Sequence, residues 1–96
     1  MVSFKDLHDA TLLSLLVDWA SGELRFKVVI GRPEKMEVQL VARGMTSLKC
    51  PRAFPWGRSI SVNSVTLNRA ADKSLFLVEM QSGDVIEASV DDVVAV

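Results

Sequence analysis

The side chains best suited to binding or chemistry are concentrated in residues 50–58, which read Cys-Pro-Arg-Ala-Phe-Pro-Trp-Gly-Arg. Because its two prolines lack a backbone donor, we expect this segment to be a loop and not a central strand. Loop aromatics beside arginines are side chains that protein-binding surfaces favour. We therefore expect Arg52, Phe54, Trp56 and Arg58 to form a binding surface. The alternative is that one or both rings fold under the sheet and fill its open end.

A second group that could carry chemistry is the pair His8 and Asp9. An imidazole beside a carboxylate can act as a general base, or as a metal ligand with its supporting group. However, His8 is the only histidine and Cys50 the only cysteine, which is fewer ligands than a zinc site uses. We expect His8 and Asp9 to hydrogen-bond to backbone near the start of the first strand. We also expect no metal and no cofactor.

Sequence motifs of the common enzyme classes are absent. The chain has no glycine-rich phosphate loop and no GxSxG, HExxH or CxxC motif. A nucleophilic Cys50 would need a base or a cation to form its thiolate, and no Cys–His pattern accompanies it. The sequence therefore favours a protein without enzymatic activity.

Length and composition indicate a single domain spanning residues 1–96. Hydrophobic residues make up 49% of the chain, which excludes a disordered protein. The net charge of −1 supplies no positive field for a phosphate backbone, so we expect no nucleic-acid partner. A single cysteine suits a reducing compartment. Because no signal peptide and no apolar run near the ~20 residues of a membrane helix are seen, we expect a cytoplasmic protein without a membrane partner.

Alternating apolar and polar residues predict β structure along most of the chain. The expected strands are residues 11–19, 23–30, 36–42, 59–68, 74–81 and 84–90, with a further short strand within 45–49 and either a strand or a small helix within 91–96. Short glycine-containing turns at 20–22 and 82–84 join two pairs of strands as hairpins. The expected fold is mainly β, an antiparallel sheet of six to seven strands arranged as a β-sandwich or a curved, barrel-like sheet with little helix.

Three local features are expected within this pattern. Ser3 followed by Asp6 is typical of a short helical turn at the N-terminus. The apolar phase of the first strand continues to Trp19, which we expect in the core, with Asp18 accepting hydrogen bonds in the turn that follows. Residues 59–68 change phase near positions 63 and 64, which indicates a β-bulge.

Charge is unevenly distributed along the chain. Residues 43–58 carry four cations and no acid, namely Arg43, Lys49, Arg52 and Arg58. Residues 79–96 carry five acids and no base, namely Glu79, Asp84, Glu87, Asp91 and Asp92. Two oppositely charged patches can steer a partner, or pair with each other within a monomer or a dimer. The alternative is that strand alternation simply places charges on the solvated faces.

Two stretches of the chain carry a family resemblance. The first is His8-Asp9-Ala10 followed by Leu12, Leu13, Leu15, Val17-Asp18-Trp19 and Gly22, and the second is Phe54-Pro55-Trp56-Gly57 followed by Ser59, Val62-Asn63 and Val65. Together they cover about half of the chain, and they resemble a family of small bacterial β-rich proteins, a domain of unknown function without an established activity. The chain is also loosely similar to immunity proteins of polymorphic toxin systems. This resemblance implies a class of function and assigns no role to any residue.

Three functional hypotheses follow, in order of preference. The first is a non-enzymatic module that binds a protein partner through the loop 50–58, as an immunity protein binds a toxin. The second is a structural homo-oligomer assembled through a strand edge or the apolar tail Val93–Val96, where charges that keep sheets apart are missing. The third is a small-molecule binder or an enzyme around His8 and Asp9, together with Cys50.

Overall fold

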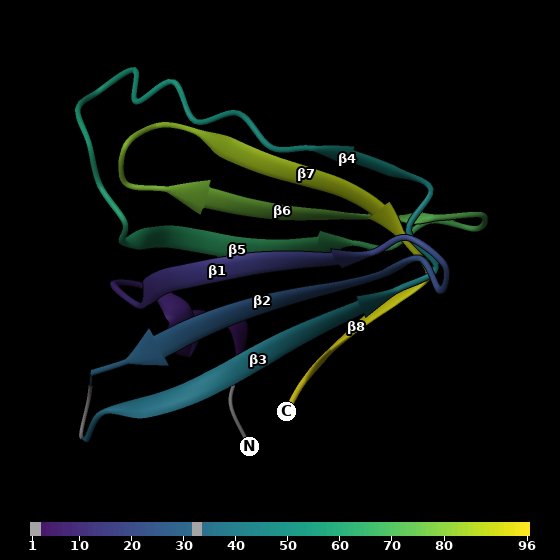
Figure 1. The fold of residues 1–96 in the computed structure, drawn as a ribbon, viewed down its shortest axis with the longest axis horizontal. Coiled ribbons are helices and arrows are strands. Elements are labelled where there is room, and N and C mark those ends of the chain that lie inside the picture. Colours follow the sequence, from purple (N-terminus) through teal and green to yellow (C-terminus); the bar gives the residue numbers. More distant parts are fainter. Residues whose placement is uncertain (1–2, 32–33) are drawn as a thin grey trace.

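The computed structural model describes residues 3–31 and 34–96, which contain one short 3₁₀ helix and eight strands (Figure 1). The helix η1 (Phe4–Leu7) precedes β1 (Thr11–Asp18), β2 (Glu23–Ile30), β3 (Met36–Arg43), β4 (Ser47–Lys49), β5 (Val62–Asn68), β6 (Ser74–Met80), β7 (Val85–Val90) and β8 (Asp92–Ala95). Among these residues, no helix has the length and apolar character needed to cross a membrane.

The strands form two antiparallel sheets of four, in the orders β1-β2-β3-β8 and β4-β7-β6-β5. The prediction of a mainly β, antiparallel fold with little helix is confirmed. The strand count is higher than the six to seven expected, because the short segments within 45–49 and 91–96 are both strands. Among the described residues, one isolated bridge joins Thr11 of β1 to Ser61, the residue before β5.

The core lies between the two sheets and is built from alternate residues of β2, β3, β6 and β7. Its members include Leu24, Phe26, Val28, Val38, Leu40, Phe76, Val78, Ile86, Ala88 and Val90. The rings of Phe26 and Phe76 meet edge to face, with their centroids 5.4 Å apart and an interplanar angle of 79°. The predicted alternation agrees with burial in β2, and in β3 except at Met36, which is exposed, and at Val41, which is buried.

The prediction fails for the apolar face of β1. Trp19 was expected in the core, but it lies beyond the end of β1 in the hairpin turn and is 88% exposed. A register shift between Leu12 and Ser14 also breaks the alternation, and Leu13 at the shift is exposed. Because β1 is an edge strand with β2 on one side only, few neighbours cover its side chains.

Three other local predictions are confirmed. Ser3 and Asp6 form a capping box at the start of η1. Asp18 accepts a hydrogen bond from the Ser21 N–H at 3.2 Å, which closes the β1–β2 turn. The register of β5 against β6 shifts between Val62 and Ser64, at the position of the expected bulge.

Candidate functional site

The loop between β4 and β5 passes along one edge of its sheet, beside the turn that joins β6 to β7 (Figure 1). Phe54 has a φ of 52° and Gly57 a φ of 107°, so the backbone turns sharply on both sides of Trp56. Within this bend, the Gly57 N–H donates to the Phe54 carbonyl at 3.0 Å, and the Trp56 N–H donates to the Ser82 carbonyl at 2.9 Å. The loop is thus held both to itself and to the neighbouring turn.

The buried carboxylate of Asp84 is the main anchor of this loop. It accepts hydrogen bonds from the Ala53 N–H at 2.9 Å, from the Phe54 N–H at 3.0 Å and from the Ser82 hydroxyl at 2.7 Å. Burial by itself raises the pKa of Asp84, but these hydrogen bonds and the nearby Arg52 charge outweigh it and lower the pKa below its usual value. The anchor is therefore an ionised carboxylate at neutral pH.

Both arginines of the loop flank the ring of Phe54. The guanidinium carbon of Arg52 lies 4.6 Å from the ring centroid, and that of Arg58 lies 5.8 Å from it. A guanidinium within about 6 Å of an aromatic ring is attracted by the ring quadrupole. Phe54 is half-buried beneath the two exposed arginines, so the three side chains form one cationic and aromatic group.

The side chain of Trp56 is 78% exposed, yet it rests on the β6–β7 turn. A Cβ atom placed on Gly83 would lie 2.8 Å from Trp56 Cδ2 and 3.0 Å from Pro55 Cγ, so this close approach requires glycine. Gly83 also has a φ of 92°, a conformation that favours glycine. Trp56 therefore has one contact with the turn while most of its indole faces solvent.

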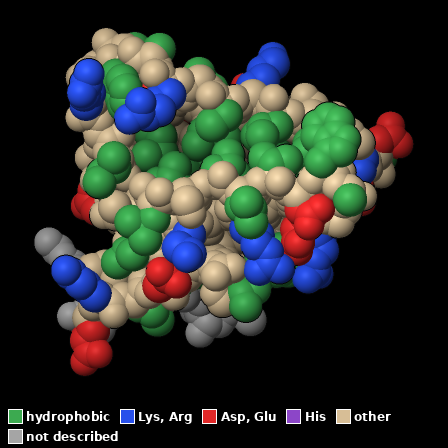
Figure 2. Space-filling model, in the orientation of Figure 1, with side chains coloured by type: hydrophobic (Ala, Val, Ile, Leu, Met, Phe, Trp, Pro, Cys, Tyr) green, Lys and Arg blue, Asp and Glu red, His purple; other side chains and the backbone are tan. Residues whose placement is uncertain are grey.

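A cavity of about 260 Å³ lies between this loop, the first half of β1 and the floor formed by β6 and β7. Its lining is mostly apolar and includes Leu12, Leu13, Leu15, Cys50, Pro51, Phe54, Ile60, Met80 and Ile86, with Arg52 and Asp84 among its polar residues. Figure 2 shows hydrophobic side chains gathered in a hollow across this face, with Lys and Arg side chains at its upper left and others spread over the lower part of the face. The half-buried ring of Phe54 thus lines an apolar recess, whereas Trp56 is not among its lining residues.

The structure does not bring His8, Asp9 and Cys50 together in this cavity. Cys50 is exposed and lines it, whereas His8 and Asp9 do not. His8 Nδ1 lies 2.8 Å from the Asn63 carbonyl oxygen, and Asp9 Oδ1 accepts a hydrogen bond from Gln81 Nε2 at 2.5 Å. His8 thus contacts backbone at the bulged start of β5, as expected, whereas Asp9 contacts a side chain just after β6 and not backbone. Within residues 3–31 and 34–96, no three His, Cys, Asp or Glu side chains are grouped as metal ligands.

Within the monomer, two of the four cations in residues 43–58 lie opposite acids of residues 79–96. The strand register places Lys49 opposite Glu87 and Arg43 opposite Asp92. Lys73 Nζ lies 2.6 Å from Asp91 Oδ1, and Asp84 is bonded inside the loop. In contrast, Arg52 and Arg58 have no ion-pair partner within 4 Å among the described residues.

Sequence reasoning missed Asp84, which it grouped with the surface acids. The available signal was its position in a Ser-Gly-Asp turn, where a carboxylate can accept backbone N–H groups. The comparison with known proteins adds no further assignment, since no protein-family model, no curated protein and no solved structure matches this chain.

Proposed function

We propose that this protein is a non-enzymatic module that binds a protein partner through Arg52, Phe54, Trp56 and Arg58, called the loop surface below. The observation that carries the proposal is the combination of an indole that is 78% exposed with a backbone fixed by Asp84. An isolated protein gains little by keeping a tryptophan side chain in water, whereas a partner can bury it.

The arrangement of the loop surface suits binding because its groups are already ordered. Hydrogen bonds from the Ala53 and Phe54 N–H groups to Asp84 fix the backbone, so a partner need not supply that ordering free energy. Tryptophan and arginine are the residue types most often responsible for binding energy at protein interfaces. The adjoining cavity offers a recess for an apolar side chain of the partner.

The charges of the loop surface point to the chemistry of the partner. Arg52 and Arg58 project beside the Phe54 ring, so they favour a partner that presents acidic side chains around an apolar centre. A toxin domain bound by an immunity protein in the cytoplasm is the specific form that the family resemblance suggests. Such a partner would bury Trp56 and place carboxylates against the two guanidinium groups.

The experiment that tests this function is affinity capture from lysate of the native source, with the wild-type chain and two variants in parallel. The Trp56→Ala/Arg58→Ala variant removes the loop surface, and the Trp19→Ala variant removes an equally exposed tryptophan elsewhere. We expect a stoichiometric protein that binds the wild type and Trp19→Ala but not the double variant. Equal capture by all three folded proteins would contradict binding through the loop surface. Capture of no protein would contradict the existence of a partner.

A further inference from the structure

We propose that the free edge of β1 pairs in antiparallel fashion with β1 of a second copy of this chain, forming a two-fold symmetric dimer. The pairing would join two four-stranded sheets into one continuous sheet across the molecule. This inference goes beyond the proposed function and does not use the loop surface.

The first observation is that β1 ends its sheet with an open edge. β2 pairs with one side of β1 from Thr11 to Asp18. On the other side, the isolated bridge to Ser61 and the hydrogen bond from the Leu12 N–H to the Ile60 carbonyl involve only the beginning of the strand. From Leu13 onward, alternate backbone groups of β1 face outward without a strand beside them in the described part of the chain, as a template for another strand.

The second observation is that, apart from the register shift between Leu12 and Ser14, this edge carries no side chain of the kinds that normally prevent pairing. Residues 11–17 contain no charged side chain and no proline. Leu13, Leu16 and Val17 are all exposed, with Leu16 61% exposed. Natural edge strands usually carry lysine, proline or a strong twist that blocks edge-to-edge contact.

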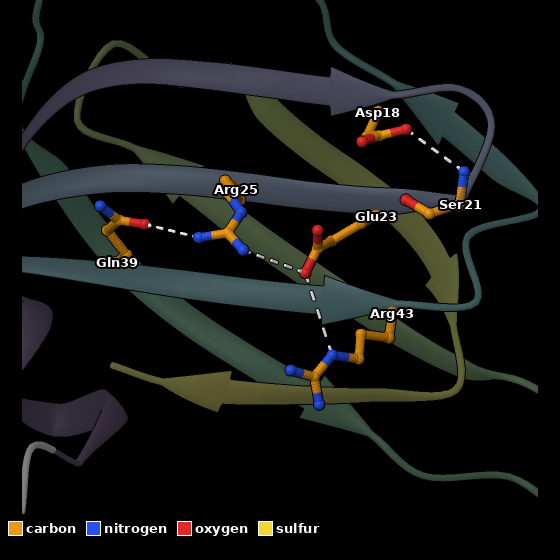
Figure 3. Close-up of polar contacts among 6 residues, drawn as sticks. All are labelled: Asp18, Ser21, Glu23, Arg25, Gln39 and Arg43. Atoms are coloured by element: carbon orange, nitrogen blue, oxygen red, sulfur yellow. Dashed lines mark hydrogen bonds and ion pairs between the residues drawn. The ribbon is translucent and has the colours of Figure 1, made fainter.

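The neighbouring strands on the same outer face are different, because their polar side chains satisfy one another. Figure 3 shows Arg25 directed toward both Gln39 and Glu23, at 3.1 and 3.4 Å, and Arg43 reaching the same Glu23 carboxylate at 3.9 Å. Leu16 lies beside Arg25 in the register and adds an apolar side chain at the margin of this network. In this sheet the exposed apolar side chains therefore lie mainly on β1, with Val94 of β8 at the opposite edge.

The charges at the two ends of β1 identify the occupant as a second copy. Asp18 and Glu23 face each other at one end, and Ser14 faces Lys27 toward the other end. Neither Asp18 nor Lys27 has a cross-strand ion pair among residues 3–31 and 34–96, and Asp18 bonds only within its own turn. An antiparallel copy brings the acidic end of one β1 to the Lys27 end of the other, twice by symmetry.

One register satisfies both the apolar and the charge requirements. When Leu16 lies opposite Leu16 of the second copy, the most exposed aliphatic side chain of β1 becomes covered. In the same register, Ser14 lies opposite Asp18 of the second copy. Lys27 is then two strands from that Asp18, about 10 Å between Cα atoms, which the two side chains can bridge. In this register, even-numbered residues of one β1 lie opposite even-numbered residues of the other. The inner apolar faces of the two sheets therefore lie on the same side of the joined sheet.

A disulfide experiment tests this register directly in the full chain. Leu16→Cys and Ser14→Cys are made separately in a Cys50→Ser background, because exposed Cys50 would cross-link by itself. Opposite Cα atoms lie about 4.5–5.5 Å apart, within disulfide reach, whereas the two Ser14 positions would be more than about 13 Å apart. Mild oxidation should therefore yield covalent dimers of Leu16→Cys and not of Ser14→Cys. No Leu16→Cys dimer, or equal cross-linking of both variants, would overturn the proposal.

A charge exchange followed by sedimentation equilibrium provides the second test. Asp18→Lys places a positive charge near Lys27 of the second copy. Because the symmetric dimer contains this contact twice, the substitution should weaken the dimer about tenfold. Asp18→Lys/Lys27→Asp reverses both charges and should restore the wild-type dissociation constant. A monomeric wild type at every soluble concentration would contradict the pairing, as would a folded double variant that stays as weak as Asp18→Lys.

Discussion

The two tryptophans of this chain are both exposed, but different interactions hold the segments that carry them. Trp56 lies in a loop whose neighbouring N–H groups donate to Asp84, about thirty positions away in the sequence. Trp19 lies in the β1–β2 turn, where Asp18 accepts hydrogen bonds from Ser21 and Gly22 of the same turn. The loop surface therefore depends on the tertiary fold, whereas the turn at Trp19 is largely closed by local bonds.

The loop that carries Trp56 and the edge of β1, which ends next to Trp19, suit different kinds of contact. A loop fixed by a buried carboxylate can present side chains in a shape that no regular strand offers, and a specific partner can recognise that shape. A regular strand edge presents backbone groups at a fixed spacing, which another strand can match. We therefore propose a different protein as the partner of the loop surface, and a second copy as the partner of the β1 edge.

Replacing Asp84, which anchors the loop, should have the largest effect on stability. Asp84→Ala leaves the Ala53 and Phe54 N–H groups and the Ser82 hydroxyl without their acceptor, and should lower the urea midpoint of unfolding clearly. Asp18→Ala removes one exposed side-chain bond and should lower the midpoint only slightly. Equal midpoints for the two variants would contradict the distinction between them.

The contribution of Asp84 should also depend on pH. Since its folded-state pKa is lowered, the unfolded chain binds more protons near the usual Asp pKa of about 4, and the contribution is complete above that pH. It is lost as pH falls through the lowered pKa. The difference in unfolding free energy between wild type and Asp84→Asn should therefore shrink on acidification, and a constant difference would contradict the ionised anchor.

A smaller effect is expected from the glycines that underlie the two segments. Gly83→Ala combines a positive φ with a Cβ atom 2.8 Å from the Trp56 ring, and should cost about 1–3 kcal/mol of unfolding free energy. Gly22→Ala has a φ of 70° but no atom nearer than 3.4 Å, and should cost about 1 kcal/mol. In a Trp19→Phe background, Trp56 fluorescence should change with Gly83→Ala and not with Gly22→Ala. A shift with both would contradict the contact between Trp56 and Gly83.

The smallest effect is expected from removing the exposed rings themselves. Trp19→Ala should change the free energy of unfolding by less than about 0.5 kcal/mol, because its side chain is almost entirely in solvent. Trp56→Ala should cost more than Trp19→Ala, since its ring contacts Gly83. Chemical denaturation of both variants measures the difference. A larger loss for Trp19→Ala would show that this ring packs against the protein.

Much of the fold could be predicted because strand alternation reports directly on burial. The alternation in β2 agrees with the burial of Leu24, Phe26 and Val28, and the phase change in β5 identified its bulge. Trp19 was assigned wrongly because a register shift in β1 and the position of the strand end are decided by tertiary pairing. Alternation alone does not encode those two features.

The sequence was sufficient to predict the loop of the candidate site, but not the hydrogen bonds to Asp84 that hold it. The prolines and aromatics of residues 50–58 marked the loop, and the loop is not a strand in the structure. Asp84 was invisible as its anchor because the contact joins positions about thirty apart in the chain. The pairing of Phe54 with both arginines likewise depends on a backbone bend at φ 52° that no local pattern specifies.

The central claim is that the loop surface is ordered before any partner binds. Amide hydrogen exchange of Ala53 and Phe54 in the free protein tests this claim most directly, because both N–H groups donate to Asp84. We expect slow exchange in the wild type and fast exchange in Asp84→Ala, with the amides of β2 protected equally in both. Exchange of Ala53 and Phe54 at the rate of an unstructured chain in the wild type would contradict it.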